Sequence, residues 1–126
     1  MFVINGDNSI YLTRGDIAPI AVSVLKSNKE LYKLQPGDII RLTVTVKNKC
    51  SDVVIQKDVV INDEADVAVI QLTSKDTKIG DIINKPIDYW YDIVLNPDTA
   101  PQTIIGYDTL GPKIFRLFPE GDDIDA

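Results

Sequence analysis

The sequence predicts an all-β protein, an Ig-like antiparallel β-sandwich of seven or eight strands. Apolar and polar residues alternate in several runs, which is the period-two pattern of half-buried strands. Clusters of Gly, Pro, Asn and Asp separate these runs every eight to twelve residues, as is typical of sandwiches. Of the 19 acidic residues 16 are Asp, which favours turns, and only 3 are Glu, which favours helices. No long helix is therefore expected.

The clearest strand covers residues 40–47, where Ile, Leu and Val alternate with Arg, Thr and Lys. A turn at Pro36, Gly37 and Asp38 leads into it. The strand before it has an inward-facing residue at every second position, namely Ala18, Ile20, Val22 and Val24. These segments place the first strands of the sandwich.

The middle of the chain predicts two more strands. Residues 53–61 form one long strand with a bulge, in which two apolar runs flank the polar residues 56–58, and residues 67–72 form a second strand. The polar residues 62–66 between them favour a turn, so the two strands are predicted to pair as a hairpin. Residues 74–78 then predict a short connecting turn.

The last third of the chain predicts strands at residues 88–95, 103–106 and 113–118. Turn residues at 96–98 and 108–112 separate them. One domain is therefore expected over residues 1–118. Residues 119–126 are acidic and poor in apolar side chains, and we expect a flexible tail there.

Composition excludes several classes of partner. The net charge of −6 and the lack of a basic stripe argue against nucleic acid. Charges interrupt every apolar run, which argues against a membrane span. The N-terminus shows no signal peptide and the single cysteine allows no internal disulfide, so synthesis in a bacterial cytoplasm is expected.

The residue types for common catalytic chemistry are missing. The chain has no histidine, so Ser–His and Cys–His nucleophile pairs are excluded. The usual zinc ligand sets, a phosphate loop and the EF-hand spacing do not occur. We therefore expect no enzyme, no cofactor and no metal site.

A cluster of aromatic and acidic residues lies in the strand at residues 88–95. Strand parity places Tyr89 and Tyr91 on the core face and Asp88, Trp90 and Asp92 on the opposite, more polar face. An indole beside two carboxylates can stack on a sugar ring or anchor a protein interface. The alternative is that a loop or a neighbouring strand covers Trp90.

Several segments in order resemble a known family: residues 12–19, 34–38, 75–78, 89–95 and 103–105. Together they are similar to the N-terminal domain of upper baseplate proteins, found in tailed phages and prophages of Gram-positive bacteria. The similarity spans residues 8–118. It implies a β-sandwich that serves as a structural module of a phage tail tip. Its shared motifs contain residues suited to turns and amide capping, and these are Gly15, Asp16, Gly37, Asp38 and Asp76.

The resemblance implies a non-catalytic structural protein of a phage or prophage tail or baseplate. Such a protein is expected in the virion, in contact with other tail or baseplate proteins or with copies of itself. Because the chain ends at Ala126, we expect a short adaptor or decoration rather than the anchor of a long arm. The alternative function is a carbohydrate-binding module that recognises a host cell-wall glycan through Trp90, Asp88 and Asp92.

Overall fold

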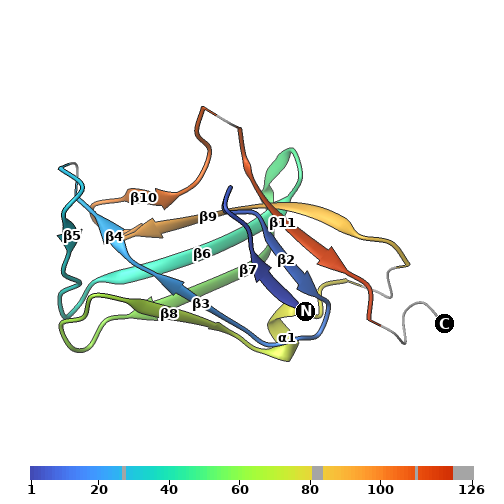
Figure 1. The fold of residues 1–126 in the computed structure, drawn as a ribbon, viewed down its shortest axis with the longest axis horizontal. Coiled ribbons are helices and arrows are strands. Elements are labelled where there is room, and N and C mark those ends of the chain that lie inside the picture. The colour runs from blue at the N-terminus through green and yellow to red at the C-terminus, as the bar shows by residue number, and fades with distance from the viewer. Residues whose placement is uncertain (27, 81–83, 110, 121–126) are drawn as a thin grey trace.

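The computed structural model describes residues 1–26, 28–80, 84–109 and 111–120, without the side chain of Cys50. Strands make up 55% of the described structure and helix 4%, which confirms the predicted all-β class. The described part of the chain contains eleven strands and one short helix (Figure 1), more than the seven or eight strands predicted. The excess comes from short pieces of two to four residues, which are too brief to show an alternating pattern.

The elements in chain order are β1 (Phe2–Ile4), β2 (Ile10–Thr13), β3 (Ala18–Val22), β4 (Val24–Leu25), β5 (Leu31–Tyr32), β6 (Ile39–Val46), β7 (Lys49–Val60), β8 (Ala68–Leu72), α1 (Ser74–Thr77), β9 (Ile87–Leu95), β10 (Gln102–Ile105) and β11 (Lys113–Phe118). The connecting turn predicted at residues 74–78 is thus a single helical turn. Thr73 caps it in a reciprocal capping box with Asp76. No helix in the described part of the chain is long and apolar enough to cross a membrane.

The main sheet has seven strands, in the order β1-β2-β11-β9-β6-β7 with β10 also paired to β9. Strands β3 and β8 form a second sheet, and β4 and β5 a third. The predicted antiparallel architecture is wrong for one pair, because β2 and β11 run parallel. These two strands come from opposite ends of the chain, and residue alternation carries no information on the direction of such distant partners.

The predicted hairpin between residues 53–61 and 67–72 is also wrong. Strand β7 pairs with β6, whereas β8 pairs with β3 in the second sheet. The segment between β7 and β8 is held by residues that precede β6, since Leu34 and Ala65 exchange backbone hydrogen bonds of 2.8 and 3.1 Å. The turn residues therefore carry the chain from one sheet to the other.

The buried faces of both sheets meet in one apolar core. Buried and exposed residues alternate strictly in β3 and in β8, as the sequence pattern predicts. The core side chains of β6 and β9 are Ile40, Leu42, Val44, Tyr91, Ile93 and Leu95. The outer positions of β3 and β8 are therefore exposed.

The start of the predicted tail contacts the body of the protein. Glu120 Oε1 lies 3.5 Å from the Arg14 guanidinium and 3.5 Å from Lys78 Nζ. Arg14 is itself buried and donates hydrogen bonds to the carbonyl oxygens of Ile79 and Gly80. Residues 121–126 of the predicted tail lie outside the described residues.

Candidate functional site

Strand β9 carries the three predicted binding residues in the middle of the main sheet. Its core face buries Tyr91 and Ile93, and Trp90 lies half-buried on the other face. Trp90 is opposite Thr45 of β6 on one side and Ile114 of β11 on the other. The predicted assignment of faces in this strand is therefore confirmed.

Asp88 interacts with other residues than Trp90. Its carboxylate accepts two hydrogen bonds from Arg116, at 2.6 and 3.1 Å. These bonds lower the pKa of Asp88 below its ordinary value. The Arg116 guanidinium also lies 5.1 Å from the centre of the Tyr11 ring. Asp88 is thus engaged in an ion pair and lines a different cleft, together with Lys47 and Lys85.

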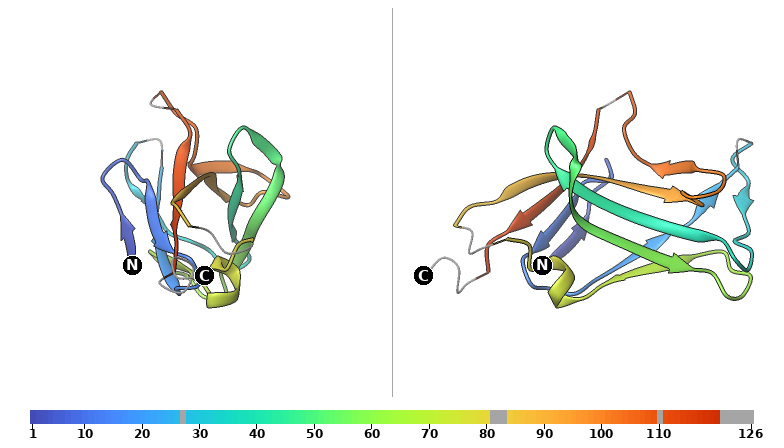
Figure 2. Two further views of the ribbon diagram at one scale, coloured as in Figure 1. Left: turned by 90° about the vertical axis from the view of Figure 1, so that its right-hand side faces the viewer. Right: turned by 180° about the vertical axis from the view of Figure 1, so that it is seen from behind.

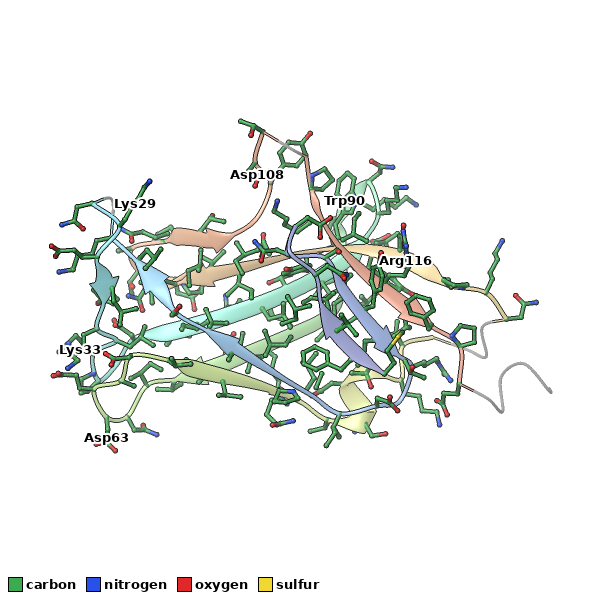
Figure 3. All side chains as sticks on the ribbon, in the orientation of Figure 1. Lys29, Lys33, Asp63, Trp90, Asp108 and Arg116 are labelled. Atoms are coloured by element: carbon green, nitrogen blue, oxygen red, sulfur yellow. The ribbon has the colours of Figure 1, made fainter. Side chains whose placement is uncertain are left out.

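Trp90 and Asp92 share a pocket of about 190 Å³. The β10–β11 connection supplies further residues of its wall, and the outer face of β6 supplies others. The main lining residues are Thr43, Trp90, Asp92, Tyr107, Pro112 and Lys113. Figure 2 shows why these parts meet: the β6–β7 hairpin and the β10–β11 connection project from the same side of the molecule. Figure 3 shows Trp90 on the same side of the molecule as Asp108, which belongs to this connection.

Of the two charged residues that line this pocket, one forms an ion pair and the other does not. The Lys113 ammonium lies 2.7 Å from Asp108 Oδ2, and the Lys113 side chain is almost fully buried. Asp92 makes no hydrogen bond or ion pair with any residue that the structure describes, and burial raises its pKa. The Trp90 Nε1 atom is buried and has no acceptor among the described residues. The site therefore combines an unpaired carboxylate, an unpaired donor and a satisfied ion pair.

Sequence reasoning missed Tyr107, Asp108 and Lys113 as site residues, since it assigned residues 108–112 to a turn and residues 113–118 to a strand. Tyr107 is 76% exposed, the largest value among the exposed apolar side chains. Backbone hydrogen bonds between Asp108 and Gly111 close this turn, at 3.2 and 2.9 Å. An exposed aromatic residue next to a turn is the signal that could have found the site.

The five predicted turn residues hold the scaffold and lie outside this pocket. Gly15 and Gly37 have φ of 86° and 93°, which side chains rarely allow. Asp38 accepts hydrogen bonds from the Gln35 amide, the Tyr32 hydroxyl and the Asn96 amide group. Asp76 accepts the amide of Thr73. Asp16 instead pairs with the N-terminal ammonium at 2.5 Å, where the sequence predicted a contact with backbone amides.

A second surface, absent from the sequence predictions, lies on the outer side of β3 and β8. We call it the neutral face, and it consists of Ile17, Pro19, Ala21, Val67, Val69 and Gln71. All six side chains are exposed and none is charged. Figure 1 shows the two strands side by side along one edge of the molecule, with α1 at their end. The uncharged residues at alternate positions of each segment are visible in the sequence. Only the pairing of β3 with β8 brings the two sets together into one face.

Among the described residues, no three His, Cys, Asp or Glu side chains are grouped so that they could hold a metal ion. Comparison with protein-family models, with curated proteins and with solved structures found no match to this chain. The resemblance to the upper baseplate proteins therefore stays a prediction.

Proposed function

We propose that this chain is a non-catalytic structural protein of a phage or prophage tail or baseplate that acts through contacts with other tail proteins. The ordered motifs over residues 8–118 support this proposal, because they resemble the N-terminal domain of upper baseplate proteins. The all-β, sandwich-like fold agrees with what that resemblance implies. The missing histidine supports a function without nucleophilic or zinc catalysis.

The neutral face is the observation that carries the proposal. A quarter of all residues are charged, and the outer positions of strands are normally the place for charged side chains. The outer positions of β3 and β8 instead present Pro19, Ala21, Val69 and Gln71. The centres of protein–protein interfaces are depleted of charged residues in the same way. For a chain of net charge −6, an uncharged patch is also the place where another acidic protein can approach without repulsion.

The occupant of the neutral face is, in this proposal, a second tail protein with a matching uncharged, apolar surface. The first test is mass spectrometry of purified particles from an induced source strain. We expect this chain in stoichiometric amount among the particle proteins. Its absence from intact particles would overturn the proposal.

A matched pair of variants tests the surface itself. Val69 and Val53 are each 48% exposed, but only Val69 lies on the neutral face. A lysine at a buried interface leaves an unpaired charge, so Val69→Lys should lower incorporation into particles at least about tenfold. Val53→Lys should leave incorporation unchanged. Equal incorporation of both variants would contradict the role of the neutral face.

The pocket beside Trp90 favours a second candidate function, recognition of a host cell-wall glycan. Two of the three residues predicted for that function, Trp90 and Asp92, line one pocket. Asp88 is engaged by Arg116 and is left out of this candidate. The two functions are compatible, because the pocket and the neutral face belong to different sheets.

A further inference from the structure

Two polar groups at the Trp90 pocket lack partners. The Asp92 carboxylate is partly buried and makes no hydrogen bond with the described residues, and the Trp90 Nε1–H is buried without an acceptor among them. The Trp90 Nε1 atom is sealed from solvent, whereas the unpaired Asp92 oxygens are not and can be reached from the pocket. A molecule that donates a hydrogen bond therefore fits the Asp92 carboxylate.

The rings at the pocket define the shape of such a molecule. Trp90 lies in the sheet and Tyr107 projects from the β10–β11 connection, and both line the same cavity. Aromatic faces bind the apolar C–H face of a sugar ring, while the polar rim of the sugar stays free for hydrogen bonds. The volume of about 190 Å³ equals the space of about six water molecules, which suits one ring rather than a chain of rings.

The charges at the pocket disfavour an anionic ligand. The unpaired Asp92 carboxylate would repel an anion. Lys113 is already paired with Asp108, so it does not require a carboxylate from the ligand. A hydroxyl group meets these conditions, since it can donate to Asp92 without bringing a charge.

We propose that this pocket binds one ring of a neutral saccharide. In this arrangement the ring packs against Trp90 and Tyr107 and donates a hydroxyl hydrogen bond to Asp92. The inference specifies the ligand of the second candidate function, so it rests on that candidate and is independent of tail assembly.

The test uses the full chain and follows Trp90, the single tryptophan of the protein. Methyl glycosides of glucose, galactose, rhamnose and N-acetylglucosamine are titrated separately, up to their solubility limits. We expect at least one of them to change the fluorescence of Trp90 and to shift its single indole N–H resonance in a saturable way. Glucuronate and N-acetylarginine amide serve as the anionic and cationic probes, and neither should produce this change.

Three variants and one control assign the binding to this pocket. Asp92→Asn should weaken binding at least about tenfold, because the charged acceptor is lost. Tyr107→Ala should weaken it about tenfold, and the high exposure of Tyr107 means that folding is little affected. Trp90→Phe keeps a ring but makes it smaller, and should cost about fivefold, measured by the resonances of neighbouring residues. Asp63→Asn, at the opposite end of the molecule in Figure 3, should change nothing.

Three other outcomes are possible, and each of them would contradict a different part of the proposal. If none of the neutral glycosides binds and purified cell wall does not bind either, the glycan candidate itself is wrong. If cell wall binds equally well to the protein and to the Asp92 and Tyr107 variants, glycan recognition stands but not this pocket. If only the arginine probe binds, the pocket receives a basic side chain of a protein partner and the saccharide proposal is refuted.

Discussion

The outer faces of the two sheets differ in the number and pairing of their charged side chains. On the main sheet, Arg116 pairs with Asp88, and Arg41 forms hydrogen bonds with both Asp58 and Asp98. On the second sheet, the neutral face carries no charge at all. Both surfaces are open to solvent, so exposure alone does not explain the difference. A face on which most charges pair with one another is suited to water, whereas a face without charges is suited to cover by another protein.

The two sides of β8 allow the sharpest test of this comparison. Ile70 is fully buried and the adjacent Val69 is exposed. Ile70→Ala should lower the free energy of unfolding by about 3 kcal/mol, because it removes buried methyl groups and leaves a cavity. Val69→Ala should change it by less than about 0.5 kcal/mol. Urea unfolding followed by Trp90 fluorescence measures both, and comparable losses would mean that Val69 is part of the core.

The strand faces were predictable because burial on one side imposes strict alternation, as in β3 with Ala18, Ile20 and Val22. The pairing of β8 with β3 was not predictable, because the same alternation of buried and exposed residues fits any partner strand. The parallel contact of β2 with β11 joins residues such as Ile10 and Phe115, and no local signal links them. The same limit applies to the site: Trp90 and Asp92 lie on one strand and were found, whereas Tyr107 lies on the β10–β11 connection and Lys113 on β11.

The two carboxylates of β9 provide a second test, because their environments shift their pKa values in opposite directions. Burial raises the pKa of Asp92, so its charge costs stability above that pKa, and the cost disappears below the unfolded value of about 3.9. Asp92→Asn should therefore raise the free energy of unfolding at pH 7 by up to about 1 kcal/mol, and should have no effect near pH 3. Urea unfolding at both pH values measures this. A loss of stability at pH 7 would show that Asp92 has a stabilising partner in the folded protein.

Asp88 should behave in the opposite way. Arg116 lowers its pKa, so its contribution is present above the unfolded value and is lost as the pH falls through the folded pKa. Asp88→Asn should lower the free energy of unfolding at pH 7 by about 0.5 kcal/mol, a small value because both partners are partly exposed. The same urea measurement applies, and equal effects at pH 7 and at pH 3 would contradict an electrostatic origin.

The smallest expected effect separates the ion pairs of the main sheet from the contacts of the neutral face. Salt at about 1 M shortens the screening length to about 3 Å, so the stability lost in Asp88→Asn should shrink toward zero. Binding through the neutral face involves no charge and should persist or strengthen in a salting-out salt such as sulfate. The first part is measured by unfolding in low and high salt, and the second by the retention of this chain on purified particles. If high salt releases the chain from particles, the contact is electrostatic, and the charged face of the main sheet is then the docking surface instead.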